Sequence, residues 1–148
     1  MFFRRNFTHM KVTLKRLNDA VHFEAENETG NTMQMDGSPA IGGENKGVRP
    51  METLLMAAAG CSTIDIVMIL KKMRQNLEDI KVNVDGDKVK KDEYSYFKSI
   101  HLHYVLAGDL IETKVEKAIS MSIEKFCSVS KALEATSEIT TSYEIINS

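Results

Sequence analysis

A long apolar stretch in the first half of the chain constrains the fold more than any other feature of this sequence. The run Leu54–Cys61 is apolar on every face of a helix, and the residues around it are mostly strong helix formers. Pro50 stands where the first helical residue is expected, and Glu52 places a negative charge in the first turn. The sequence therefore predicts a long helix from Pro50 to about Gln75 that is enclosed by protein.

This helix is not expected to cross a membrane, because Glu52 and Asp65 interrupt it and no uncharged stretch of 18 residues exists. The N-terminus has no apolar run of the kind that a secretory signal peptide needs. Nineteen Lys and Arg against twenty-one Asp and Glu give a formal net charge of −2, without the basic excess that holds a phosphate backbone. We therefore expect a cytoplasmic protein with no membrane or nucleic-acid partner.

Short alternating runs on both sides of the helix predict β-strands. Residues 12–17 and 21–23, separated by Asn18-Asp19, predict a hairpin, and residues 32–36 predict a third strand. The elements expected after the helix are strands at 80–84 and 99–106, helices at 112–127 and 129–135, and a strand at 139–146. Because this order contains few βαβ units, we expect an α+β fold with a mainly antiparallel sheet.

The chain of 148 residues is expected to form one domain over residues 10–148, after a disordered N-terminal extension of residues 1–9. Residues 37–48 are rich in glycine and predict a loop of about twelve residues, a length that is usually functional or mobile.

Two cysteines are the informative polar residues of the chain. Cys61 lies inside the apolar helix and Cys127 at a junction between two helices, and both residues could simply fill the core. His101 and His103 share one face of a strand, so a zinc site built from both cysteines and a strand histidine is an alternative. Two histidines alone do not make a site, and we expect no metal and no cofactor.

Three segments carry a family resemblance. They are Pro50-Met51-Glu52-Thr53-Leu54-Leu55 with the later Gly60-Cys61, the block at 126–133 around Cys127, and the closing strand at 139–144. Together they resemble the OsmC/Ohr family of thiol-dependent peroxidases, over roughly residues 10–146. The run from Met51 to Ser62 is similar to an uncharacterised OsmC-like branch of that family.

The resemblance implies an OsmC-like fold, in which a mainly antiparallel sheet wraps around a long buried helix, and an intertwined homodimer with active sites at the interface. Cys61 would be the peroxidatic thiolate, which attacks a peroxide and becomes a sulfenic acid. Cys127 would condense with it to a disulfide, which an external thiol or dithiol reduces. The implied enzyme is a peroxiredoxin-like peroxidase that reduces organic hydroperoxides or hydrogen peroxide in defence against oxidative stress.

Glu52 corresponds to the family carboxylate that positions an arginine beside the thiolate. The stretch 18–36, where the family arginine lies, holds no Arg or Lys, and Arg16 is in the first strand. Arg49 is the candidate substitute, but a helical rise of 1.5 Å per residue places it ~18 Å from Cys61 along the axis. At 100° per residue Glu52 points to the face opposite Cys61, so both residues would act only on the partner subunit's cysteine.

The missing arginine motivates an alternative function. A cysteine in a helix interior gains little from the helix dipole, so the dipole would stabilise a Cys61 thiolate only weakly. Asp65 lies one turn beyond Cys61 on the same face, and its negative charge would oppose formation of that thiolate. Lys131, four residues after Cys127, is expected to favour ionisation of Cys127. The alternative is a non-enzymatic OsmC-like dimer that binds a small apolar ligand at its interface.

Overall fold

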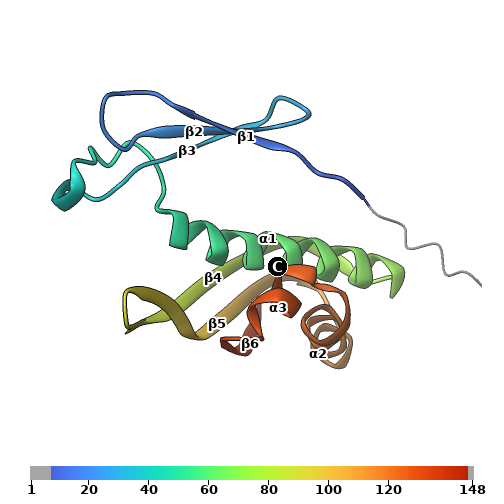
Figure 1. Ribbon diagram of the computed structural model, residues 1–148. Coiled ribbons are helices and arrows are strands. Elements are labelled where there is room, and N and C mark those ends of the chain that lie inside the picture. Colours follow the sequence, from blue (N-terminus) through green and yellow to red (C-terminus); the bar gives the residue numbers. More distant parts are fainter. Residues whose placement is uncertain (1–7, 147–148) are drawn as a thin grey trace, which may run out of the picture. The chain divides into compact units, whose positions relative to one another are not determined.

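The computed structural model describes residues 8–146, so most of the extension expected at residues 1–9 lies outside the described part of the chain. Two compact units are present, one ending at Thr53 and the other beginning at Leu54 (Figure 1). The boundary falls in the first turn of helix α1 (Pro50–Lys72). The expectation of a single domain over residues 10–148 stays a prediction.

The N-terminal unit is a three-stranded antiparallel sheet in the order β1 (Val12–Arg16), β2 (Phe23–Asn27) and β3 (Thr32–Met35). Arg16 pairs with Phe23 at the hairpin end, and Phe23 pairs in turn with Met35. The predicted hairpin and third strand are therefore confirmed.

The predicted glycine-rich loop follows β3 and contains one short 3₁₀ turn, η1 (Pro39–Ile41). The buried carboxylate of Asp36 organises the rest of this loop. It accepts hydrogen bonds from the backbone N–H groups of Gly37, Glu44 and Lys46 at 2.7–3.0 Å. These bonds, above all the bond from Lys46, lower the pKa of Asp36, because they stabilise the charged form.

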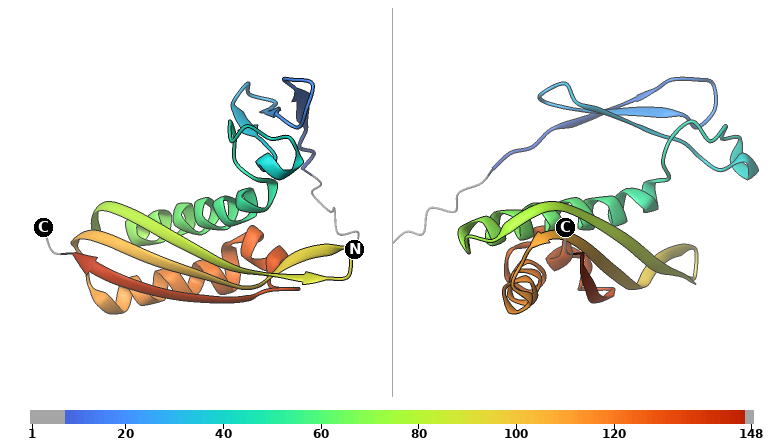
Figure 2. Two further views of the ribbon diagram at one scale, coloured as in Figure 1. Left: turned by 90° about the vertical axis from the view of Figure 1, so that its left-hand side faces the viewer. Right: turned by 180° about the vertical axis from the view of Figure 1, so that it is seen from behind.

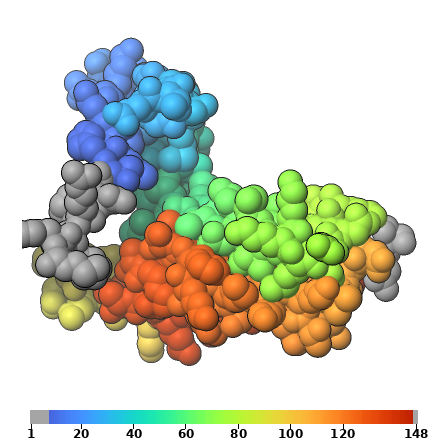
Figure 3. Space-filling model, turned by 90° about the vertical axis from the view of Figure 1, so that its right-hand side faces the viewer, coloured from blue at the N-terminus to red at the C-terminus, as the bar shows by residue number. Residues whose placement is uncertain are grey.

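Helix α1 starts at Pro50, as predicted, and ends at Lys72, where two lysines complement the helix dipole. One face of the helix is buried through Ala58, Ser62, Ile66, Ile69 and Leu70. The C-terminal unit itself leaves the other face of the helix uncovered, and side chains of α1 (green) lie at the surface in Figure 3. Its exposed apolar residues are Leu54, Met56, Ile64, Val67 and Met68. The helix is therefore enclosed on one side only, which differs from the expectation of burial all round.

By length and composition alone α1 could cross a membrane, since its most apolar 18-residue window has a mean hydropathy of 1.9. The core helix of a soluble protein meets the same criterion. Here the buried face packs against protein, and Asp65 lies within the helix.

The C-terminal unit has a second three-stranded sheet in the order β4 (Asn76–Lys91), β5 (Tyr94–Asp109) and β6 (Glu138–Ile146). Strands β4 and β5 pair antiparallel, whereas β5 and β6 pair in parallel. The parallel pairing follows from the helical crossover between them, which comprises α2 (Glu112–Met121), the π-helical turn η2 (Ser122–Phe126) and α3 (Ser128–Leu133). The sheets are mainly antiparallel, so the predicted α+β class is confirmed (Figure 2).

The core of this unit lies on one face of β5. Alternate residues Ile100, Leu102, Tyr104 and Leu106 are fully buried, as expected for a strand with one covered face. The hydroxyl of Tyr104 donates a hydrogen bond to Ser62 Oγ at 2.7 Å and so ties α1 to the sheet.

Candidate functional site

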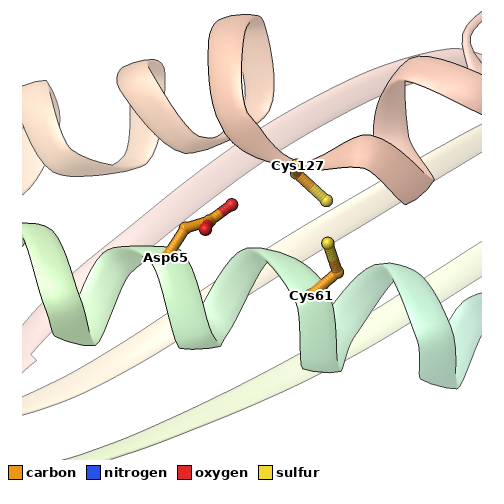
Figure 4. A group of neighbouring side chains, drawn as sticks. All are labelled: Cys61, Asp65 and Cys127. Carbon is orange, nitrogen blue, oxygen red and sulfur yellow. The ribbon is translucent and has the colours of Figure 1, made fainter. Parts of the chain in front are cut away.

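Cys61 and Cys127 face each other within the C-terminal unit, and the side chain of Asp65 lies beside them (Figure 4). The two Sγ atoms and a carboxylate oxygen of Asp65 are all within 4.8 Å of one another. Both cysteines are free thiols. The structure thus brings together two cysteines that are far apart in the sequence, together with a carboxylate.

Helix α1 positions Cys61 and Asp65 on one face, because residues four apart in an α-helix lie one turn above each other. Cys61 is half-buried at the margin between the covered and the uncovered face. The neighbouring Ser62 Oγ donates to the carbonyl of Ala58 at 2.8 Å and accepts the bond from Tyr104. This buried pair fixes the rotation of α1 at the turn that carries Cys61.

The π-helical turn η2 positions Cys127. Its backbone N–H donates to the carbonyl of Ser122 at 2.7 Å, five residues back, and the chain then leaves the helix with Cys127 in an extended conformation. Cys127 is the N-cap of α3, since its Sγ accepts hydrogen bonds from two groups of Ser130. These are the backbone N–H at 3.4 Å and the side-chain hydroxyl at 3.1 Å. The side chain is fully buried.

Burial raises the pKa of the Cys127 thiol, and the two hydrogen bonds from Ser130 oppose this shift without cancelling it. Lys131 does not assist, contrary to our expectation. Its ammonium group lies 3.1 Å from both carboxylate oxygens of Glu134 on the surface. Cys127 in this arrangement is a protonated thiol near neutral pH.

Two serines complete the surroundings of the thiols, and neither was expected from the sequence. Ser122 Oγ is within hydrogen-bond distance of Asp65 Oδ2 at 3.4 Å and of the carbonyl of Ser62 at 3.2 Å, so it joins η2 to α1. Ser130 stands three residues after Cys127, which is the spacing of a capping box. That spacing could have identified Ser130 as a partner of the Cys127 thiol.

Arg49 and Glu52 belong to the N-terminal unit, and their interactions lie within it. The guanidinium of Arg49 donates to the carbonyl of Asp36 at 3.0 Å and to the side chain of Asn45. Glu52 accepts a bond from the backbone N–H of Arg49 at 2.8 Å. Glu52 therefore contacts the main chain of Arg49, and among residues 8–146 no carboxylate forms an ion pair with the guanidinium.

The strand histidines do not join the thiols. His101 and His103 lie on the face of β5 opposite the buried Tyr104 and form hydrogen bonds with Thr140 and Ser142 of β6. A zinc site that uses a strand histidine is therefore excluded by this fold, because the Cys pair lies on the covered face with α1. The carboxylate of Asp65 stands where such a histidine would be needed.

The fold and the paired thiols define the class: an α+β protein with two facing cysteines, one on a long central helix and the other at a helix junction. The family described as OsmC-like protein matches residues 43–142. This chain belongs to that family, as the resemblance in the sequence implied.

The relatives agree with this assignment. Protein YhfA of Escherichia coli strain K12 is 38% identical over 129 residues, which cover 86% of this chain and 92% of that protein. A hypothetical protein from Aquifex aeolicus VF5 is 30% identical, with a TM-score of 0.83 over 96% of this chain and 99% of its own. An organic hydroperoxide resistance protein OsmC from Legionella pneumophila has a TM-score of 0.73 over 95% of this chain and 99% of its own. At 15% identity, this last likeness shows the fold alone.

Proposed function

We propose that this protein is a cytoplasmic thiol-dependent peroxidase of the OsmC/Ohr type, which reduces organic hydroperoxides or hydrogen peroxide in defence against oxidative stress. The observation that carries the proposal is the facing pair of free thiols, Cys61 and Cys127. The Sγ atoms are already within 4.8 Å, so small side-chain rotations bring them to the ~2.05 Å of a disulfide.

The reaction would proceed in three steps. The Cys61 thiol gives up its proton, and the resulting thiolate attacks one oxygen of the O–O bond; an S–O bond forms, the O–O bond breaks, and the leaving alkoxide (or hydroxide) takes up the proton from the thiol to become an alcohol (or water). The Cys127 thiol then attacks the Cys61 sulfenic acid, forming the disulfide and releasing water. Two external thiols, or one dithiol, supply two electrons and two protons that restore both cysteines.

The difference in burial supports these roles for the two cysteines. Cys61 is half-buried and can be reached by a peroxide from solvent, whereas Cys127 is fully buried behind it. A residue that reacts with a small substrate needs access, while a residue that resolves the sulfenic acid needs only to lie next to it.

The exposed apolar face of α1 supports a homodimer, because a second copy would cover the side chains that the single chain leaves in water. In such a dimer Arg49 would provide the cation for the partner's thiolate. Among the described residues its guanidinium contacts uncharged acceptors and no carboxylate, so its charge is not neutralised by them. Glu52, which bonds to the backbone N–H of Arg49, would hold that residue in place.

Mass spectrometry of the reduced protein after one equivalent of an organic hydroperoxide tests the proposal. We expect loss of two hydrogen atoms and a Cys61–Cys127 bridge. Cys61→Ser should leave Cys127 unmodified, and Cys127→Ser should stop at a sulfenic acid on Cys61 that a sulfenic-acid-specific reagent captures. Wild-type thiols that stay unmodified would refute peroxidase function.

The role of Arg49 has its own test, with a matched control. Arg49→Ala should slow peroxide consumption about tenfold or more, because an adjacent opposite charge is worth a pKa unit or more to a thiolate. Arg16→Ala removes an exposed arginine of the same unit and should leave the rate unchanged. Equal rates for the two variants would exclude Arg49 from the reaction.

The second candidate function is a non-enzymatic dimer that binds a small apolar ligand at its interface, and a cavity in the N-terminal unit offers a different place for such a ligand. This cavity has a volume of about 260 Å³, and apolar side chains of Leu14, Val21, Phe23 and Met35 line it. This volume is below the usual range of about 300–1,000 Å³ for ligand pockets, so only a very small apolar molecule would fit. Two results together would favour this function over the peroxidase. The wild-type protein would retain an apolar fluorescent probe that the Phe23→Asp variant does not bind, and its thiols would not react with peroxide.

A further inference from the structure

We propose that Cys61, Asp65 and Cys127 of the reduced protein bind one Zn²⁺ ion per chain. This site is separate in its chemistry from peroxide reduction, since it needs neither a peroxide nor the disulfide. It also differs from the zinc site that the sequence suggested as an alternative, because the third ligand is the carboxylate of Asp65 on α1 and not a strand histidine.

The spacing of the three ligand atoms fits the ion. Because each pair of atoms is within 4.8 Å, one point lies no more than about 2.8 Å from all three. Zinc needs ~2.3 Å to sulfur and ~2.0–2.2 Å to a carboxylate oxygen. Side-chain shifts of roughly half an ångström would therefore complete the coordination, without movement of the helices.

The kind of ligand selects the metal. Two thiolates with one carboxylate suit zinc, whereas Mg²⁺ and Ca²⁺ require oxygen ligands alone. Three protein ligands leave a fourth tetrahedral position, and the partial exposure of Cys61 lets water reach it. The thiol of Cys127 would release its proton when zinc binds, and the charge of the ion would stabilise the thiolates beside the Asp65 carboxylate.

Hydrogen bonds around the ligands already hold two of them in position. Ser130 donates to Cys127 Sγ through both its N–H and its hydroxyl group. Ser122 Oγ is 3.4 Å from Asp65 Oδ2, and this contact orients the carboxylate. Such outer contacts fix the geometry of metal ligands and raise affinity. Zinc and the Cys61–Cys127 disulfide exclude each other, because the disulfide uses both sulfur ligands.

Zinc titration of the fully reduced full-length chain against a chromogenic chelator tests the proposal. We expect one Zn²⁺ per chain, and Co²⁺ in its place should give thiolate-to-cobalt charge-transfer absorption together with tetrahedral ligand-field bands. Asp65→Asn should weaken zinc affinity by about tenfold or more, since loss of even an outer contact has this effect. Asp92→Asn is the matched control, because it neutralises an exposed carboxylate in the β4–β5 turn and should leave affinity unchanged.

The cobalt spectrum of the wild-type chain decides the outcome even if a variant folds poorly. Absence of bound zinc in the reduced wild-type protein, or a cobalt spectrum without thiolate absorption, would refute the site. Equal affinity in folded Asp65→Asn and wild-type chains would remove Asp65 as a ligand and overturn the proposed ligand set. Because no peroxide is present, failure of the peroxidase proposal would not change these results.

Discussion

The buried hydrogen bond between Tyr104 and Ser62 should show a marked asymmetry when either partner is removed. Ser62→Ala leaves the fully buried Tyr104 hydroxyl without an acceptor, which costs about 1–3 kcal/mol of unfolding free energy. Tyr104→Phe removes the donor, but Ser62 Oγ keeps its bond to the carbonyl of Ala58 at 2.8 Å. That variant should lose only about 0.5–1.5 kcal/mol.

The double variant should lose less unfolding free energy than the sum of the two single losses. Once Tyr104 is replaced by Phe, Ser62→Ala no longer leaves a buried tyrosine hydroxyl without a hydrogen-bond acceptor. Urea unfolding of reduced protein at fixed concentration, followed by far-ultraviolet circular dichroism because the chain has no tryptophan, measures all four free energies. If Ser62→Ala costs no more than Tyr104→Phe, or if the two losses are additive, this account of how α1 is tied to the sheet is wrong.

The Tyr104–Ser62 pair should also make the stability of the protein depend on pH. Burial raises the pKa of Tyr104 from 10.0 to about 12, even though the bond to Ser62 lowers it. The unfolded chain therefore loses this proton first, and stability falls as the pH rises from 10 to 12, by up to about 3 kcal/mol. The difference between wild type and Tyr104→Phe isolates this effect, and parallel pH profiles for the two proteins would contradict it.

Three further perturbations test other parts of the structure. Ser130→Ala removes a hydroxyl donor 3.1 Å from Cys127 Sγ, so the pKa of Cys127 should rise further and its alkylation should shift to higher pH. An unchanged pH profile of alkylation would show that this hydrogen bond has no effect on the pKa. Gly86→Ala would place the new Cβ 2.7 Å from the ring of Phe97 and should lower the unfolding free energy, measured in urea, by about 1–3 kcal/mol. A urea midpoint equal to that of the wild type would mean that the Phe97 ring moves aside without cost. Ile64→Lys puts a charge on the exposed face of α1, where Ile64 is 66% exposed, and should yield folded monomers by light scattering after size exclusion; a persistent dimer would place the interface elsewhere.

The sequence predicted α1 well, because Pro50 and the terminal lysines mark both ends of an apolar run. Strands β4 and β5 are longer than predicted, at 16 residues each. Charged side chains at Lys88, Lys90 and Lys91 obscure the alternation near the β4–β5 turn, as is common on edge strands. The change from α-helical to π-helical hydrogen bonding between α2 and η2 was not predicted. The bond from the N–H of Cys127 to the carbonyl five residues back depends on how Cys127 packs in the folded chain.

The candidate site was predicted in part. Helical spacing correctly placed Asp65 on the face of Cys61, whereas the proximity of Cys127 came only from the family resemblance. The contact of Glu52 with the backbone of Arg49 was missed, since a carboxylate near a helix start can bond to the main chain as readily as to an arginine side chain. No sequence pattern indicated Ser122, because its contact with Asp65 crosses between distant segments.

The π-helical turn behaves like a single-residue insertion in an otherwise regular helix. Deleting one exposed residue of the turn, such as Glu124 or Lys125, would restore four-residue hydrogen bonding. Every later residue would then rotate by about 100° and shift by about 1.5 Å relative to α2, which would carry the second sulfur away from the first. A one-residue deletion between Ser122 and Phe126 is therefore expected to separate the two thiols, whereas the buried residues of α1, α2, β4 and β5 precede the deletion in the chain.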